Sequence, residues 1–379
     1  MSTPVLSIVM ATYGAREWVE RALEAVERHT DVPYEVVVVD NASTDGTPDL
    51  IRERFPSVRL VENAQNAGYG GANNQAASLA SAPVLALLNS DAIVPPGWAS
   101  PLLAALERPG VGVVVPTLVH LDGTLQTAGA VLGADGSVLA LGNGADPDDP
   151  FYAFARACDF GAGACMFVRR EDFLAVGGFD PVYDPAYFED ADLCLALAAR
   201  GQRTLFVPEV RVAHQQFASS DPARAEELFL RSRTPFLERW GETLAADRLP
   251  SVLPEDPART LAARDALTRG RVLVLCGAAL PAHDSLDGTL LASLSDPARE
   301  LRVTLAAAGG DARAWSAAGA EVVPTEDADA LLAARAGHYD VVAGDLEGHT
   351  PALRTHQPQA LAAGSLVEAA RLADMLGAA

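Results

Sequence analysis

The sequence of 379 residues contains no lysine: its 28 basic residues are all arginine, against 50 acidic residues, for a formal net charge of −22. The missing lysine excludes a phosphate-binding P-loop and Schiff-base catalysis, because both need that side chain. The excess of acid argues against a nucleic-acid or anionic membrane surface, since proteins bind such surfaces through a basic face. We therefore expect no nucleic-acid partner.

Cysteines and long apolar runs are also scarce. Cys158, Cys165, Cys194 and Cys276 are widely and irregularly spaced, which predicts neither a zinc knuckle nor a disulfide framework. No stretch approaches the roughly eighteen uninterrupted apolar residues of a membrane span. The apolar stretch near the amino terminus lacks the basic start of a secretion signal. These absences favour a cytoplasmic protein with reduced, buried thiols.

What the sequence does contain is buried strands that alternate with helices. Leu6–Ala11, Tyr34–Asp40 and Val84–Asn89 are apolar runs typical of strands buried on both faces of a parallel sheet. Their alternation with segments of helical spacing predicts βαβ units. The length and a hydrophobic content of 49% favour two domains. We expect an α/β domain over residues 1–250, a linker rich in Pro, Asp and Arg over 251–269, and a smaller Rossmann-like α/β domain over 270–379.

Polar residues gather where these strands end. The first strand leads into Thr12 and Tyr13, the second ends at Asp40, and the fourth is followed by Asn89-Ser90-Asp91. Open α/β sheets bind ligands at the carboxyl ends of their strands. The third expected strand, Val58–Glu62, leads into "ENAQNAGYGGANN", and glycines before a helix leave backbone N–H groups free for a phosphate. Each segment alone also fits a plain turn or helix cap. Together, at successive strand ends, they indicate a binding site.

A series of motifs runs in order through about residues 5–240: "LSIVMATYGAREWVERALEAV", "DNASTDGT", "NAGYGGANNQA", "LLNSDAIV", "GAGACMFVRRE", "GGFD", "YFEDADLCL" and "PEVRVAHQ". In these motifs the chain resembles the inverting family 2 glycosyltransferases of the GT-A fold, and most of all their rhamnosyltransferase-like branch. The resemblance implies a GT-A type doubly wound, mostly parallel sheet. It also implies a nucleoside-diphosphate-sugar donor, a divalent metal, and sugar transfer in one step with inversion, in glycan or polysaccharide biosynthesis.

The resemblance also implies roles for the residues at the strand ends. Asp40 stands where related enzymes accept a hydrogen bond from a pyrimidine base. Asn89-Ser90-Asp91 stands in the place of the Asp-x-Asp signature, so Asp91 is the expected ligand for Mg²⁺ or Mn²⁺, and His214 is expected to bind the same ion. Asn89 departs from the fully acidic pattern and lowers the charge of the site. The other residues expected at the donor are Thr12, Tyr13, Asn41, Asp45, Asn66, Gly68, Tyr69, Asn73, Asn89 and Ser90.

Glu189-Asp190 matches the Glu-Asp pair that the family places ahead of a helix, and both are predicted catalytic residues. An acceptor hydroxyl must lose its proton as it attacks the anomeric carbon, and a carboxylate can take that proton, so Asp190 is the candidate general base. The residues alone leave other interpretations open. The two acids would also stabilise a helix N-terminus, and a lone histidine such as His214 is more often structural. Without a metal, Arg169 or Arg170 would have to neutralise the diphosphate.

Two other functions stay open. A sugar-1-phosphate nucleotidylyltransferase also has a doubly wound nucleotide fold, although "ATYGAREW" is a poor version of its glycine-rich first loop. Asn89 motivates the second alternative, a non-catalytic module that binds sugar nucleotides or glycans. The C-terminal domain resembles part of a GT-B N-terminal half, and we expect an accessory domain there and not a second active site. The partners we expect are a dTDP-, UDP- or GDP-sugar, a glycan, lipid-linked or small-molecule hydroxyl acceptor, and a second copy in a homodimer.

Overall fold

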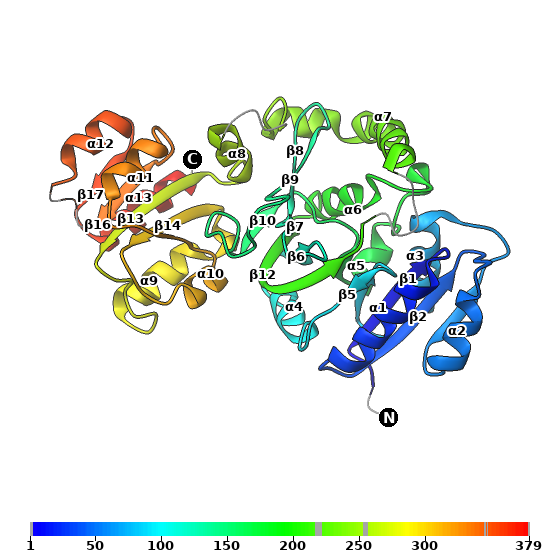
Figure 1. Cartoon of the computed structure of the whole chain (residues 1–379). Coiled ribbons are helices and arrows are strands. Elements are labelled where there is room, and N and C mark those ends of the chain that lie inside the picture. Colours follow the sequence, from blue (N-terminus) through cyan, green and yellow to red (C-terminus); the bar gives the residue numbers. More distant parts are fainter. Residues whose placement is uncertain (1–2, 217–221, 253–256, 345, 347, 378–379) are drawn as a thin grey trace. The chain divides into compact units, whose positions relative to one another are not determined.

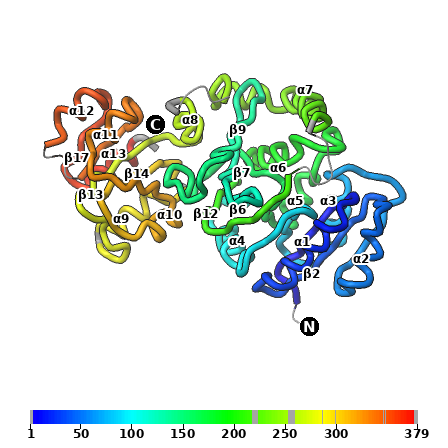
Figure 2. Tube along the Cα trace, in the orientation of Figure 1, coloured from blue at the N-terminus to red at the C-terminus, as the bar shows by residue number. Residues whose placement is uncertain are grey.

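The computed structural model describes residues 3–216, 222–252, 257–344, 346 and 348–377, and it divides into two compact units. Unit 1 comprises Met1–Pro147 and Cys158–Leu253, and unit 2 comprises Asp148–Ala157 and Pro254–Ala379. Figures 1 and 2 trace the chain through both units. The division differs from the expected one in two places. Residues 257–264 of the expected linker form a helix, and ten residues from the middle of the expected first domain belong to unit 2.

Unit 1 contains a mostly parallel sheet in the order β10-β12-β6-β11-β4-β1-β2-β3. Antiparallel pairs in this sheet include β11 with β4 and β6, β5 with β12, and β7 with β6. The strands of this sheet are β1 (Leu6–Thr12), β2 (Tyr34–Asp40), β3 (Arg59–Glu62), β4 (Val84–Leu88), β5 (Ala92–Ile93), β6 (Val111–Val119), β7 (Leu125–Thr127), β10 (Arg156–Cys158), β11 (Cys165–Arg169) and β12 (Arg203–His214). A separate hairpin joins β8 (Ala130–Leu132) to β9 (Val138–Ala140).

The helices of unit 1 pack their apolar sides on this sheet. In α1, the buried positions Val19, Leu23 and Val26 recur at helical spacing and join a core in which Trp98 meets Phe167 edge to face at 5.3 Å. The helical segments are α1 (Arg16–His29), α2 (Thr47–Arg54), α3 (Gly68–Leu79), α4 (Ala99–Leu106), α5 (Arg170–Ala175), the 3-10 turn η1 (Pro181–Tyr183), α6 (Glu189–Ala198) and α7 (Pro222–Asp247).

Unit 2 contains five parallel strands in the order β15-β14-β13-β16-β17, the order in which doubly wound nucleotide folds arrange their first five strands. Alternate residues of β13 face opposite sides, because Val272 and Val274 join one hydrophobic cluster and Leu273 and Leu275 join another. In Figure 1, α9 and α10 lie on one side of the sheet, and α11 and α12 lie on the other.

The strands of unit 2 are β13 (Gly270–Gly277), β14 (Leu301–Ala307), β15 (Glu321–Pro324), β16 (Val341–Gly344) and β17 (Leu361–Ala363). Its helical segments are α8 (Pro257–Arg264), α9 (Leu286–Ser295), the 3-10 turn η2 (Pro297–Arg299), α10 (Arg313–Ala318), α11 (Ala328–Ala334), α12 (Thr350–His356) and α13 (Leu366–Gly377). Across the described part of the chain, we find no helix with the length and apolar character that crossing a bilayer requires. The resemblance of this unit to a GT-B half stays a prediction.

Candidate functional site

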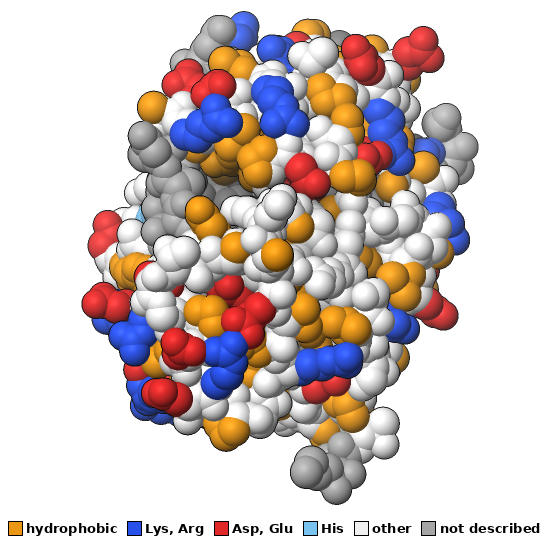
Figure 3. Space-filling view, turned by 90° about the vertical axis from the view of Figure 1, so that its right-hand side faces the viewer, with side chains coloured by type: hydrophobic (Ala, Val, Ile, Leu, Met, Phe, Trp, Pro, Cys, Tyr) orange, Lys and Arg blue, Asp and Glu red, His pale blue; other side chains and the backbone are white. Residues whose placement is uncertain are grey.

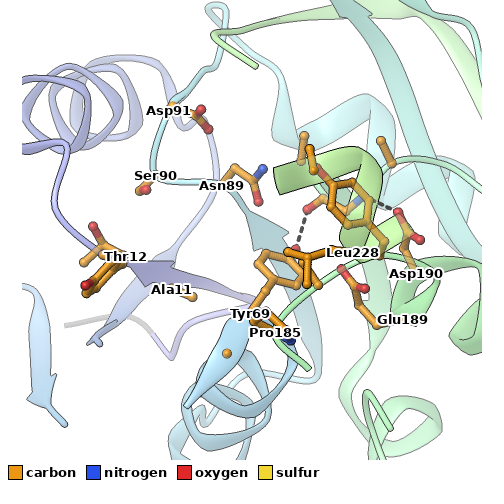
Figure 4. Close-up of a pocket in the computed structure, with 18 of the residues that line it drawn as sticks. Ala11, Thr12, Tyr69, Asn89, Ser90, Asp91, Pro185, Glu189, Asp190 and Leu228 are labelled. Carbon is orange, nitrogen blue, oxygen red and sulfur yellow. Dashed lines mark hydrogen bonds between the residues drawn. The ribbon is translucent and has the colours of Figure 1, made fainter. Parts of the chain in front are cut away.

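A pocket of about 590 Å³ in unit 1 opens where β1 and β4 end and α3 begins. Figure 4 shows Thr12 and the Asn89-Ser90-Asp91 turn on one side of it and Glu189 with Asp190 on the other. Most of the predicted site residues line this pocket: Thr12, Tyr13, Asn41, Asn66, Gly68, Tyr69, Asn89, Ser90, Asp91, Glu189, Asp190 and His214. The topology therefore brings the polar strand ends together, as expected for an open α/β sheet.

Three predicted donor residues are not among the pocket walls. Asp40 is buried at the end of β2; its Oδ1 accepts a hydrogen bond from Ser43 N at 2.8 Å, and its Oδ2 is buried without a partner among the described residues. Asp45 accepts hydrogen bonds from Arg16 N and Thr47, so it fixes the turn between β2 and α2. Asn73 donates to the Tyr69 carbonyl inside α3.

Asn41 connects the second strand end to the glycine-rich segment. Its Nδ2 donates to Gly68 O at 3.0 Å, and its Oδ1 accepts from Ala67 N at 3.2 Å. Gly68 has φ +78°, and a Cβ there would lie 2.5 Å from an oxygen of Asp184, so only glycine fits this turn. Tyr69, the next residue, donates its hydroxyl to Gly163 O at 2.7 Å.

The group formed by Asn89, Asp91 and His214 depends on strand pairing. Because β5 pairs antiparallel with β12, His214 lies opposite Ala92 and beside the turn that ends β4. His214 Nε2 lies 3.2 Å from Asp91 Oδ1 and 3.2 Å from Asn89 Nδ2. Asn89 Oδ1 is buried without a partner among the described residues. Asn89 Nδ2 is placed to donate to a lone pair on His214 Nε2, and a cation between Nε2 and Asp91 Oδ1 would offset the repulsion between that lone pair and the carboxylate.

The donor set of this group fits a hard divalent cation. Asp91 Oδ1 and His214 Nε2 lie 3.2 Å apart, and Asn89 Oδ1, buried without a partner in the described part of the chain, is the third candidate ligand. Hard divalent cations favour the oxygens of such a set and leave further positions for phosphate oxygens. Among the residues that the structure describes, no group of three or more His, Cys, Asp or Glu side chains is placed to hold an ion. A metal shell at this place would therefore be partial, and Asn89 would add an uncharged oxygen where the sequence pattern of the resemblance has an acid.

The two carboxyl groups lie in the first turn of α6, where the helix dipole favours negative charge. Asp190 Oδ2 accepts from Gly163 N at 3.1 Å, and its Oδ1 accepts from Ala191 N at 2.8 Å. Burial raises the pKa of Asp190 to about 6, although these N–H groups oppose the shift. Burial, followed by the charge of Asp190, raises the pKa of Glu189 well above its usual value. Glu189 Oε2 has no partner among the described residues.

The turn before α6 has an uncommon backbone. Tyr187 and Phe188 have φ of 76° and 72°, in the left-handed region that few non-glycine residues adopt. Packing holds this turn in place, because the Phe188 ring lies 4.8 Å from Phe229 and 4.6 Å from Phe236 of α7, measured between ring centroids. Strain that is held in this way beside a pocket is typical of functional sites.

The first turns of α7 supply pocket residues that the sequence did not predict: Arg224, Ala225 and Leu228. They lie inside a helix and do not directly follow a strand in the sequence, so the rule that located the other residues could not find them. Arg169 and Arg170 instead bond backbone carbonyls, of Val111 and of Ala77, and are not among the pocket walls. The face in Figure 3 mixes arginine and acidic side chains with hydrophobic ones, so its described residues form no extended field of one sign.

Known proteins resemble this chain in sequence and in fold. The family described as "Glycosyl transferase family 2" matches residues 7–146. An N-acetylglucosaminyl-diphospho-decaprenol L-rhamnosyltransferase of Mycobacterium tuberculosis (strain ATCC 25618 / H37Rv) is 33% identical over 246 residues, which cover 58% of this chain and 80% of that protein. A validoxylamine A glucosyltransferase of Streptomyces hygroscopicus subsp. limoneus is 38% identical over 227 residues, covering 52% of this chain and 49% of that protein.

Other relatives are much longer than the match. The chain is 30% identical to uncharacterized protein y4gI of Sinorhizobium fredii (strain NBRC 101917 / NGR234) over 252 residues, 63% of this chain and 28% of that protein. A crystal structure of GalNAc-T7 with UDP, GalNAc and Mn²⁺ shares the fold with a TM-score of 0.50 and 18% identity, covering 64% of this chain and 50% of that one. The predicted GT-A type fold is thus confirmed, and the chain belongs to glycosyl transferase family 2.

Proposed function

We propose that the protein moves a sugar from a nucleoside-diphosphate-sugar to a hydroxyl acceptor, with inversion and with the help of a divalent cation. The observation that supports this proposal is one pocket that has acidic side chains on one side and a candidate cation site on the other. A buried carboxyl pair, Glu189 and Asp190, lies across from a partial cation site made by Asn89, Asp91 and His214 (Figure 4). Group transfer needs both, because a proton must leave the acceptor while charge builds up on the leaving diphosphate.

Asp190 acts as the general base in this proposal. Its pKa of about 6 leaves it ionised at neutral pH yet close enough to that pH to accept a proton efficiently. The N–H groups of Gly163 and Ala191 fix the direction of the carboxylate. The acceptor oxygen bonds to the anomeric carbon as its proton passes to Asp190, and the bond from that carbon to the diphosphate oxygen breaks. A single displacement of this kind inverts the anomeric configuration.

Glu189 has a different role in this proposal. Burial and the neighbouring charge of Asp190 raise the pKa of Glu189 well above its usual value, which favours its protonated form, since two adjacent buried carboxyls do not both ionise readily. A neutral carboxylic acid donates a hydrogen bond, and Glu189 Oε2 has no partner among the described residues. Glu189 would therefore bind a hydroxyl of the donor sugar or of the acceptor.

The diphosphate would be held at the opposite wall. Asn89, Asp91 and His214 would hold the cation, which when bound offsets the negative charge on the leaving group. Arg224 lines the pocket in the first turn of α7. Its guanidinium and the positive end of the helix dipole would add to that effect.

The nucleotide would lie along the ends of β1 and β2 and the start of α3. Asp40 Oδ2, buried and unpartnered, suits a base N–H. Two relatives support a role in glycan or polysaccharide synthesis, because one is named as an L-rhamnosyltransferase and the other as an O-antigen biosynthesis protein. The acceptor would be a glycan, a lipid-linked glycan or a small molecule with a hydroxyl group. A cytoplasmic location and a homodimer stay predictions, and light scattering tests the second.

Donor turnover with and without metal tests this function. UDP-, dTDP- and GDP-sugars are incubated with the full-length protein in Mn²⁺, in Mg²⁺ and in EDTA, and release of nucleoside diphosphate is measured. We expect metal-dependent release from one donor class. Asp91→Ala and His214→Ala should each raise the metal concentration needed, and the double variant should lose little more than the worse single one, because groups that act as a unit are non-additive.

Asp49→Ala is the matched control, since Asp49 lies on α2 and pairs with Arg52 at the surface. Full activity of Asp91→Ala in EDTA would contradict the metal proposal. Conversion of the donor to a nucleoside triphosphate and a sugar-1-phosphate when pyrophosphate is added would favour the nucleotidylyltransferase alternative. Donor binding without any turnover, with every acceptor class tried, would favour the binding module.

A further inference from the structure

Gln126 contacts the back of the histidine at the proposed cation site. Its Oε1 lies 2.8 Å from His214 Nδ1, on the side of the ring away from Asn89 and Asp91. Gln126 is only 8% exposed and lies on β7, in the segment between β6 and the small hairpin. Gln126 does not line the pocket, so it can affect the site only through its contact with His214.

Strand pairing explains how two residues so far apart in sequence meet. The end of β6 pairs with β7 through Leu118 and Val119, and the same two residues pair with β12 next to His214. Both strands are therefore fixed to one stretch of backbone. The His214 ring is held between Gln126 on one side and Asn89 with Asp91 on the other.

The hydrogen bonds that continue from Gln126 have one consistent direction. Gln126 Nε2 lies 3.5 Å from His120 Nδ1, and His120 Nε2 lies 3.0 Å from Asn143 Oδ1. Asn143 Oδ1 can only accept, so His120 donates from Nε2, and in the neutral ring its Nδ1 accepts from the Gln126 amide nitrogen. The amide oxygen of Gln126 then faces His214, and His214 must donate from Nδ1.

We propose that Gln126, oriented by His120, is a positioning residue that holds His214 in its Nδ1–H tautomer and so presents the Nε2 lone pair to the cation site. This inference rests on the proposed function, because the Nε2 lone pair serves as a ligand only if a cation binds there. Metal-binding histidines commonly donate their second N–H to a fixed acceptor, which sets the tautomer and the ring orientation. The carboxamide of Gln126 supplies such an acceptor without adding charge beside the site.

The tautomer is measured first, in the metal-free full-length protein. The protein is labelled with ¹⁵N-histidine, His214→Gln assigns the resonances, and imidazole ¹⁵N shifts are recorded near pH 8, where an ordinary histidine is neutral. We expect His214 to be protonated at Nδ1 in the wild type and in Gln126→Glu, which keeps an acceptor oxygen. Gln126→Leu removes the acceptor and should leave a mixture of tautomers.

Mn²⁺ binding is then measured by titration with electron paramagnetic resonance. Gln126→Leu should weaken binding by about 10-fold or more, the lower range for loss of such a partner, and His120→Ala should weaken it less. Gln202→Leu is the matched control: Gln202 is a partly buried glutamine whose amide donates to Asp172, outside the site. It should change neither measurement.

The outcomes separate this inference from the proposed function. If wild type binds no Mn²⁺, the metal part of the proposed function fails, whatever the tautomer. If wild type binds Mn²⁺ and Gln126→Leu binds it equally well, or if His214 keeps the same tautomer in Gln126→Leu, the positioning role of Gln126 is refuted. If Gln126→Leu and Gln202→Leu weaken binding alike, the effect is general destabilisation and the inference is also refuted.

Discussion

Unit 1 and unit 2 both bury carboxyl groups, and the pKa values of the two sets are shifted in opposite directions. In unit 1, burial raises the pKa values of Glu189 and Asp190, which face a pocket. In unit 2, burial acts in the same sense on Asp265 and Glu321, but nearby arginines lower the pKa of Asp265 well below its usual value and that of Glu321 to about 2. What differs is the partner of the acid and not its burial.

The acids of unit 2 belong to a closed network. Arg264 bonds both oxygens of Asp265 at 2.8 Å and both oxygens of Glu321 at 2.8 and 3.2 Å, and Arg335 also bonds both oxygens of Glu321. The Arg264 guanidinium also lies over the ring of Phe151, 4.2 Å from its centroid. A network with its charges paired holds structure, whereas the unpaired acids of unit 1 are available for chemistry.

The largest expected effect comes from removing the charge of the pocket acid. Asp190→Asn should lower kcat by about 10²- to 10⁴-fold, the usual contribution of a general base. Donor affinity should stay within a few-fold, because a base acts in the transition state. Steady-state kinetics and donor calorimetry measure the two effects. An equal loss of donor affinity would assign Asp190 a structural role instead.

The corresponding change in unit 2 should affect stability and leave the chemistry intact. Glu321→Gln removes the anion that Arg264 and Arg335 share, and breaking a buried pair costs about 3–5 kcal/mol of unfolding free energy. Urea unfolding measures this loss. Glu300→Gln, which removes an exposed partner of Arg269, should change it by no more than about 0.5 kcal/mol. A stable Glu321→Gln protein would show that the network contributes little.

Lowering the pH should affect the two units differently. For Asp190 the folded pKa is raised to about 6, so kcat/KM should fall about tenfold per pH unit below pH 6, as the base becomes protonated. That protonation does not unfold unit 1, because a carboxyl with a raised folded pKa favours the folded state more as pH falls. For Glu321 the folded pKa is lowered, so its stabilising effect is present above its usual pKa of about 4.5 and is lost as pH falls toward about 2.

Between pH 6 and pH 5, activity should therefore fall while circular dichroism stays constant, and loss of structure should begin only at lower pH. A pH–rate profile and an acid titration of the same preparation test this order. Simultaneous loss of activity and structure would mean that the acid limb reports unfolding.

The smallest effect is expected for Glu189→Gln in the pH profile. Burial is the first cause of the raised pKa of Asp190, and the charge of Glu189 is not among its causes, so the acid limb should stay near pH 6. Glutamine also resembles a protonated glutamate, so the rate should fall far less than in Asp190→Asn. A large shift of the limb would show that Glu189 shares the titrating proton.

The sequence predicted those parts of the molecule that depend on local patterns. β1, β2 and β4 follow from apolar runs between turn formers, and the polar residues after them do meet at one edge. The contact of Asp91 with His214 came from family resemblance alone, because the pairing of β5 with β12 is not visible in either segment. Asp45 and Asn73 show a second limit, since a side chain beside a site can bond its own turn or helix instead.

Long-range contacts account for what the sequence could not show. Gln126 looks like an ordinary strand residue until β6 is known to join β7 to β12. Nothing in the composition of residues 148–157 marks them as part of unit 2, because their partners, such as Arg264, occur much later in the chain.

The chain enters unit 2 at Asp148 and returns to unit 1 at Cys158, and this path affects how the protein folds during synthesis. Asp148–Ala157 leave the ribosome after the first strands of unit 1 but long before Arg264 and Glu321, the network with which they fold. Until Arg264 and Glu321 have been synthesised, Phe151 and Phe154 lack the network that they contact in unit 2, even once all of unit 1 has been synthesised. Deleting Pro254–Ala379 would leave residues 148–157 permanently without these partners. To remove unit 2 completely, residues 148–157 must also be replaced with a short polar loop.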